Sequence, residues 1–327
     1  MDSNNSQVLP SPPSLMKSLM AGFDAVGNHV SVVLFSVCLD FFLWFGPRLR
    51  LVKVLQPLLN QTAVMPELQN PEMIKALQVV AEEINMFSVL RTFPVGIPSL
   101  IAGRPIFKIP TGSQITWDLS SYGSIFLVWL SFIFVGLIIG SLYFKVVAQA
   151  AIVGKVDFRQ ALKEWLWTST QVSLLTIFCL VLCLVLIVPF SCLFTILFMS
   201  GLSIEQLSLL SILVAGGFLV WLIIPLFFSP HGIFINRRPV WNSLIDSIHL
   251  ARLTFATTGL LLLVILVISE GLNILWNMPP ADSWLVLVGI AGHAFISASL
   301  LAASFVYYRD ALTWIQKVIQ KTNLSVA

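Results

Sequence analysis

Charged residues are scarce in this chain. Only 10% of its 327 residues are Asp, Glu, Lys or Arg, whereas 57% are hydrophobic and the mean hydropathy is +0.93. Soluble domains carry about 25% charged residues, so this composition excludes an ordinary water-soluble globular protein. The formal net charge is only +3 and no basic run occurs, which argues against a nucleic-acid partner.

Cysteine is also rare, and sequence signatures of catalysis are missing. Cys179 and Cys183 lie one helical turn apart, which favours buried thiols on one helix face over a disulfide. The other two cysteines, Cys38 and Cys192, also lie in apolar segments. No further ligands lie at matching depth, and no HExxH, GxSxG, Walker or CxxC motif is present. We therefore predict no metal, no cofactor and no catalytic residue.

Long apolar runs are what the sequence has in abundance. A spanning helix needs about 20 apolar residues. Six segments are candidate spans, at approximately 29–46, 122–148, 168–192, 207–228, 253–276 and 284–308. Residues 1–12 are polar and proline-rich, which predicts a disordered cytoplasmic tail. Because no cleavable signal peptide precedes it, the first apolar segment is expected to remain as an anchor.

The placement of lysine and arginine predicts the orientation. The stretches 145–163 and 231–252 and the C-terminal end carry these residues, whereas the loops 200–206 and 277–283 carry none. Cytoplasmic loops are the ones enriched in Lys and Arg. We therefore expect a multi-pass cell-membrane protein with both termini in the cytoplasm. Three basic residues after the first span do not fit, but they begin a long loop, where the rule weakens; they are Arg48, Arg50 and Lys53.

A repeated pattern suggests how the spans are organised. Amphipathic stretches at 13–29, 155–167 and 239–253 each lead directly into a span, as interfacial helices do. The sequence therefore predicts an all-α transmembrane bundle of about six spans, built from three units of interfacial helix plus hairpin. The expected units are 13–149, 150–230 and 231–327.

The first unit carries an insertion at about 47–121. Its part 66–90 is expected to be helical from Pro71 onward, and four prolines and three glycines then follow in 93–113. One interpretation is an exoplasmic cap or a re-entrant segment, since irregular backbone survives at membrane depth only when it is covered. The alternative is a surface loop with a few anchors.

Small residues mark two sets of positions for close helix packing. Gly136 and Gly140 form a GxxxG pattern in the second span, and a stripe of alanines runs along the last span at Ala294, Ala298 and Ala302. Both sets are expected to pack the bundle within one chain, with homodimerisation as the alternative.

Three ionisable residues lie inside the apolar runs. Asp40 and Glu270 are about 9 Å, and His293 about 13 Å, from the same predicted outer boundary. Such groups are functional-site candidates by default, so the three define a candidate outward-facing polar pocket. The alternative is structural: Glu270 and His293 pair between adjacent helices, and Asp40 caps nearby backbone or reaches outward.

The basic elbows carry a resemblance. The segment NRRPVWNSLIDSIHLARLTF and its repeated topology, over about 150–320, resemble uncharacterised polytopic bacterial membrane proteins. They are also similar to the membrane domain attached to some glycerophosphodiester phosphodiesterases. The catalytic domain of those enzymes has no counterpart here, so the resemblance implies topology and not their activity.

Three classes of function remain. We expect a non-catalytic membrane protein of scaffold, assembly or accessory type, whose partners are the lipid bilayer and other membrane proteins or a second copy. The second class is a transporter or channel subunit that uses Asp40, Glu270 and His293. The third is an intramembrane enzyme acting on lipid with the same groups as acid and base. A dry, packed interior favours the first class, a water-filled cavity at these residues the second, and a lateral opening to lipid the third.

Overall fold

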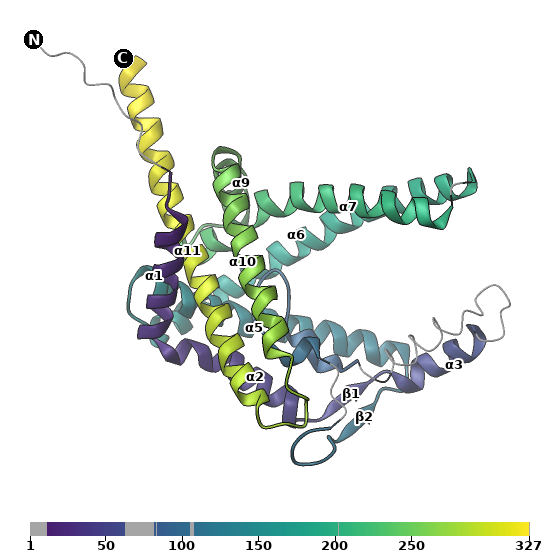
Figure 1. Ribbon diagram of the computed structural model, residues 1–327. Coiled ribbons are helices and arrows are strands. Elements are labelled where there is room, and N and C mark those ends of the chain that lie inside the picture. Colours follow the sequence, from purple (N-terminus) through teal and green to yellow (C-terminus); the bar gives the residue numbers. More distant parts are fainter. Residues whose placement is uncertain (1–11, 63–81, 83, 105–107, 202, 327) are drawn as a thin grey trace, which may run out of the picture.

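Helices make up nearly all of the regular structure (Figure 1). The computed structural model describes residues 12–62, 82, 84–104, 108–201 and 203–326. The elements before the first long span are α1 (Leu15–Asn28), η1 (Val30–Val33), α2 (Leu34–Phe45), β1 (Arg48–Arg50), α3 (Val52–Thr62), η3 (Met86–Leu90), η4 (Ile101–Gly103) and β2 (Thr116–Asp118). They are followed by α5 (Tyr122–Ile152), α6 (Phe158–Met199), α7 (Ile204–Leu226), α8 (Ser229–Asn236), α9 (Val240–Leu253), α10 (Phe255–Trp276) and α11 (Val286–Val326).

Among the described residues, five helical segments are long and apolar enough to cross a membrane. They are Tyr122–Ile152, Phe158–Met199, Glu205–Asn236, Phe255–Trp276 and Val286–Gln320. The pair α1 and α2 makes a sixth if it counts as one broken span. The all-α prediction is therefore confirmed, while the exact number of spans stays a prediction.

The first span departs most from expectation. α1 and α2 meet at an angle of 90°, so they do not form one straight helix. α1 runs alongside α11, as Figure 1 shows, and buries Ser18, Gly22 and Val26. The stretch 13–29, expected to lie in the membrane interface, therefore packs onto the last helix of the chain.

The other two amphipathic stretches differ from each other. The second, 155–167, is no separate helix, because α6 runs without a break from Phe158 to Met199 with Pro189 inside it. Proline is tolerated in membrane helices where neighbouring groups satisfy the freed carbonyl. The third, 239–253, is the separate helix α9, which Thr254 divides from α10. The three-unit repeat stays a prediction.

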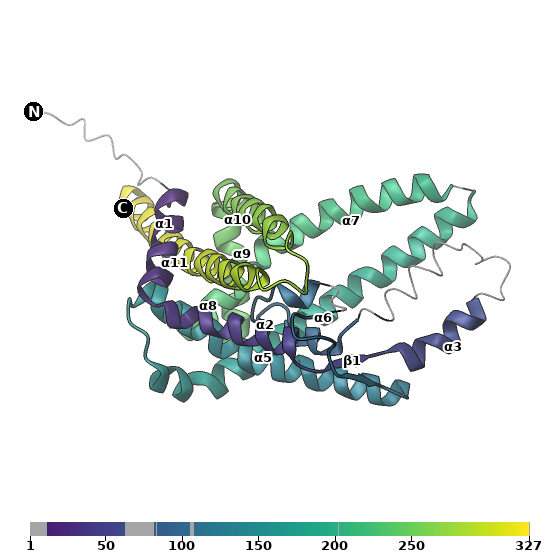
Figure 2. The same cartoon turned by 60° about the horizontal axis from the view of Figure 1, so that its bottom comes forward.

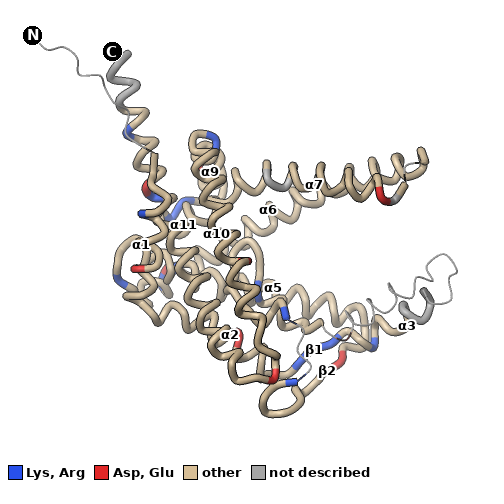
Figure 3. Tube along the Cα trace, viewed as in Figure 1, with Lys and Arg blue, Asp and Glu red and all other residues tan. Residues whose placement is uncertain are grey.

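The α6–α7 hairpin extends away from α10 and α11 (Figure 2). None of the most apolar window of α6 and only 7% of that of Glu205–Asn236 is buried. Ring contacts such as Phe190 with Phe218, whose centroids lie 5.8 Å apart, join the two helices. Most of the hairpin carries no charge (Figure 3). Its surface is therefore suited to lipid or to another apolar protein surface.

Residues 86–104 of the insertion pack onto the helices. Val95, Ile97 and Leu100 are at most 5% exposed. The short strands β1 and β2 pair in parallel, and Arg50 forms an ion pair with Asp118 at 2.9 Å. Much of the helix expected from Pro71 onward and almost all of the expected tail lie outside the described residues.

Candidate functional site

Asp40 holds the insertion in place. Its side chain is fully buried in α2. Ser99 Oγ donates to the carboxylate at 2.5 Å, and the backbone N–H groups of Leu100 and Ile101 donate at 3.2 and 3.0 Å. The carboxylate thus satisfies the otherwise free donors at the start of η4. This is the capping role named as the structural alternative, and it engages both carboxylate oxygens inside the protein.

Arg91 is linked to Asp40 through Ser99. Its Nη1 donates to the Ser99 carbonyl at 3.4 Å, and the Ser99 hydroxyl donates to the Asp40 carboxylate. His293 Nε2 lies 3.5 Å from Ser297 Oγ, and Nδ1 has no hydrogen-bond partner in the described structure. Because Ser297 and Arg91 line one cavity, this arginine lies in the neighbourhood of both predicted residues.

A cavity of about 230 Å³ opens beside this group, but the predicted residues do not line it. Arg91, Thr92 and Gly96 form one side, and Phe144 and Ser297 contribute from α5 and α11. Asp40, Glu270 and His293 are absent from its wall. The three predicted side chains therefore do not share this cavity.

Glu270 lies on the exposed side of α10. Within the described ranges, no hydrogen bond or ion pair joins it to His293 or to any other residue. Leu261, which is fully buried, stands nine residues earlier, and about 100° of rotation per residue places it on the opposite side of the helix. The expected pair fails because Glu270 has the right depth but faces away from α11.

The predicted small residues make contacts within the chain. A Cβ at Gly136 would lie 2.6 Å from the Leu90 carbonyl oxygen, and one at Gly140 would lie 2.9 Å from Gly96 Cα. Because these two glycines have no side chain, the insertion, rather than another helix, packs closely against α5 there. The three alanines of α11 (Ala294, Ala298 and Ala302) are fully buried in the core that also contains Val26 of α1. Nearby, Gly22 of α1 approaches the α11 backbone so closely that a Cβ would lie 2.5 Å from the Ser299 carbonyl oxygen.

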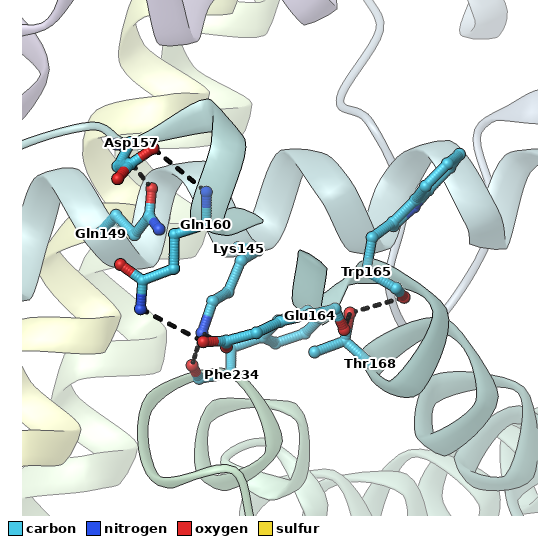
Figure 4. Close-up of polar contacts among 8 residues, drawn as sticks. All are labelled: Lys145, Gln149, Asp157, Gln160, Glu164, Trp165, Thr168 and Phe234. Carbon is cyan, nitrogen blue, oxygen red and sulfur yellow. Dashed lines mark hydrogen bonds and ion pairs between the residues drawn. The ribbon is translucent and has the colours of Figure 1, made fainter. Parts of the chain in front are cut away.

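A buried ion pair that the sequence analysis missed ties three helices together. Lys145 of α5 lies 2.6 Å from the Glu164 carboxylate of α6 and donates to the Phe234 carbonyl of α8 at 3.1 Å (Figure 4). The two side chains are only 10% and 17% exposed. Gln160 Nε2 donates to the other carboxylate oxygen at 3.2 Å. In the sequence, Lys145 serves only as one of the basic residues that predict the orientation. The turn between α5 and α6 places it next to Glu164.

A cavity of about 480 Å³ adjoins this pair. It lies where α5 ends, α6 begins and α8 ends, and its lining includes Lys145, Gln149, Lys155, Asp157 and Arg237. The Asp157 carboxylate accepts from the N–H groups of Arg159 and Gln160 and so caps α6. Five ionisable side chains contribute to its wall, against one in the cavity beside Arg91, so of these two cavities it is the better candidate for a ligand.

A histidine and a serine also meet in the core. His231 Nε2 lies 2.8 Å from Ser304 Oγ, and both residues are at most 2% exposed. Ser304 already donates its hydroxyl hydrogen to the Leu301 carbonyl at 2.7 Å, so His231 is the donor and does not act as a base toward this hydroxyl. The rings of Phe228, Phe305 and Tyr308 surround the imidazole. This pair is structural.

The fold and these sites define a class, a multi-pass α-helical membrane protein. No protein-family model, curated protein sequence or solved structure matches this chain. The resemblance to phosphodiesterase membrane domains therefore stays a prediction from the topology and the elbow pattern.

Proposed function

We propose that this protein is a non-catalytic membrane scaffold or assembly protein that binds another membrane protein through α10. The observation that carries the proposal is Glu270, an exposed carboxylate on a candidate span with no partner among the described residues. It stands six residues before Trp276, or about 9 Å inside the end of the helix. A charge at the centre of a spanning helix costs about 2.5–3.5 kcal/mol, and an unpaired one at this depth still carries part of that cost.

The face around Glu270 fits a partner helix. Val267, Glu270, Gly271 and Ile274 follow the spacing of one helical face, and all are exposed. A Cβ at Gly271 would meet nothing within 4 Å, so a second helix can approach closely there. The partner implied by this chemistry carries a Lys, Arg, His or amide side chain at matching depth, which donates to the Glu270 carboxylate.

The interior supports the same proposal over its alternatives. Asp40 accepts three hydrogen bonds inside the bundle, and Glu270 lies apart from it on the outside of the bundle. A transporter or lipid-acting enzyme using Asp40, Glu270 and His293 would need these groups at one accessible site. The mostly uncharged α6–α7 hairpin adds further surface of the kind that an assembly protein presents within the membrane.

Photocrosslinking in living cells tests the proposal. A photoreactive amino acid at Ile274 (69% exposed) reports the α10 face, and the same amino acid at Leu127 of α5 (64% exposed) is the matched control. We expect a discrete protein adduct from Ile274 and mainly lipid adducts from Leu127. Glu270→Leu should lower the Ile274 adduct about tenfold, the effect of losing roughly 1.4 kcal/mol, and Glu270→Gln should retain part of it. Lipid adducts alone at Ile274, or an unchanged adduct in Glu270→Leu, would overturn the proposal.

A further inference from the structure

The cavity beside the Lys145–Glu164 pair contains a donor that nothing in the described protein satisfies. Gln149 is 6% exposed, and its Nε2 has no hydrogen-bond partner. Its Oε1 accepts from the Asp157 backbone N–H at 3.1 Å. Turning the amide over would place its NH₂ group against that N–H, so this bond fixes the orientation. Gln149 lines the cavity, its Nε2 is held as a donor by this orientation, and a buried donor of this kind calls for an acceptor.

The charges of the cavity wall leave a positive excess of one, because three cations (Lys145, Lys155 and Arg237) face two carboxylates (Asp157 and Glu164). Glu164 accepts from Lys145 and Gln160, whereas Asp157 caps α6 through Oδ1 and keeps its negative charge. Lys145 uses two of its three N–H donors, on Glu164 and the Phe234 carbonyl. Lys155 is exposed and makes no hydrogen bond or ion pair in the described structure. The cavity thus offers a buried amide donor and one excess positive charge, which together suit an oxyanion.

The second cation at the rim has a fixed position. Arg237 adopts the left-handed conformation at φ 53° as the C-cap of α8. Its guanidinium carbon lies 5.5 Å from the centre of the Trp167 ring, a cation–π contact. The planar guanidinium suits bidentate contact with a phosphate better than a flexible ammonium does. Tryptophan is enriched at the membrane–water interface, so the rim is expected to lie at headgroup level.

We propose that this cavity binds a phosphate group, with Gln149 Nε2 and Lys145 as inner donors and Lys155 and Arg237 at the rim. The volume of about 480 Å³ lies in the range of small-ligand sites. The phosphate belongs either to an anionic lipid of the predicted cytoplasmic leaflet, as in other basic pockets between membrane helices, or to a soluble phosphate compound. This site is distinct from the α10 face, so neither proposal depends on the other.

The test uses the full-length protein and two probes. One arm measures retained lipid by native mass spectrometry after reconstitution in nanodiscs of phosphatidylglycerol or phosphatidylcholine. The other arm titrates inorganic phosphate into protein in neutral detergent by calorimetry. The variants are Gln149→Glu, a near-isostere that places a negative charge on the cavity wall, and Lys155→Glu at the exposed rim. Lys163→Glu, at an exposed basic position of α6 outside the cavity lining, is the control.

A lipid phosphate is supported by three results together. The native protein prefers phosphatidylglycerol, both cavity variants reduce that preference at least about tenfold, and Lys163→Glu leaves the preference unchanged. Phosphate binding with the same variant pattern but no lipid preference supports a soluble ligand. Lys155 is exposed, so its variant reports binding even if Gln149→Glu fails to fold. The proposal is overturned if neither probe binds, or if Lys155→Glu and Lys163→Glu behave alike.

Discussion

Removing the Asp40 carboxylate should release the insertion from the bundle. Asp40→Ala leaves the Ser99 hydroxyl and the N–H groups of Leu100 and Ile101 without their acceptor, in a place where Asp40 is fully buried. Each hydrogen bond to a charged group contributes about 1.5–3 kcal/mol, but these losses are not additive because the loop can relax. We expect a fall of about 3–5 kcal/mol in the free energy of unfolding, the range for breaking a buried charged contact. Asp40→Asn keeps one acceptor oxygen and should cost about 1–3 kcal/mol.

Equilibrium unfolding in mixed micelles, followed by circular dichroism, measures these differences. Limited trypsin digestion adds a local readout, because cleavage after Arg91 should quicken in Asp40→Ala. Asp310→Ala is the control, since Asp310 forms a more exposed ion pair with Arg309 and its loss should cost about 0–1 kcal/mol. If Asp40→Ala unfolds within about 1 kcal/mol of the native protein and resists trypsin equally, Asp40 does not anchor the loop.

Three further outcomes follow from the structure. Gly140→Leu should destabilise the protein by at least about 2 kcal/mol in the same unfolding assay, because the insertion fills the space over Gly140. Gly217→Leu is the control and should be nearly neutral, because a Cβ there would meet nothing within 4 Å. Equal effects of the two substitutions would refute the contact. Lys145→Met should lower the free energy of unfolding by about 2–4 kcal/mol, because it leaves the Glu164 carboxylate without its cation. Adding Glu164→Gln should recover part of this loss, whereas additive losses would show that the two residues are not coupled. The orientation can be tested with single cysteines in a cysteine-free background and an impermeant thiol reagent on intact cells. Cysteines at two positions should react and cysteines at two others should stay protected. The reverse pattern would show the opposite orientation. The expected reactive positions are 200 and 278, and the expected protected positions are 155 and 238.

Apolar length could be predicted from the sequence because it follows directly from composition. The predicted second span at 122–148 and the fifth at 253–276 agree with α5 and α10 to within a few residues. Boundaries next to short polar linkers were less accurate. The third span was expected to start at 168, but α6 begins at Phe158 because Asp157 caps it there and the amphipathic stretch continues into the span.

Rotation about a helix axis could not be predicted in the same way. Glu270 was placed at a reasonable depth, but its direction depends on which face of α10 meets α11. In a soluble helix the contrast between polar and apolar residues reveals that face, whereas in a membrane both faces are apolar. The inner residue Leu261 and the outer residues Leu263 and Val267 are all aliphatic, so no pattern separates them.

Contacts between distant segments explain the remaining differences. Gly136 and Gly140 were recognised as sites of close approach, but the identity of the approaching segment depends on how 86–104 folds back. The cation near Asp40 was missed for the same reason, since Arg91 follows it by some fifty residues. The Lys145–Glu164 pair was the most accessible of these contacts, because a tight turn between two long helices brings their adjoining ends together.

The packing of α1 along α11 has a consequence for how the protein is made. Gly22 fits against the backbone at Ser299 and Ala303, nearly the whole length of the chain away. Domains generally form from the N-terminus as synthesis proceeds, but α1 leaves the ribosome long before its partner exists. It must wait, with Gly22 and Val26 uncovered, while the intervening spans enter the bilayer. Folding is therefore complete only after α11 has been made. A chain that stops before α11 lacks the helix against which α1 packs.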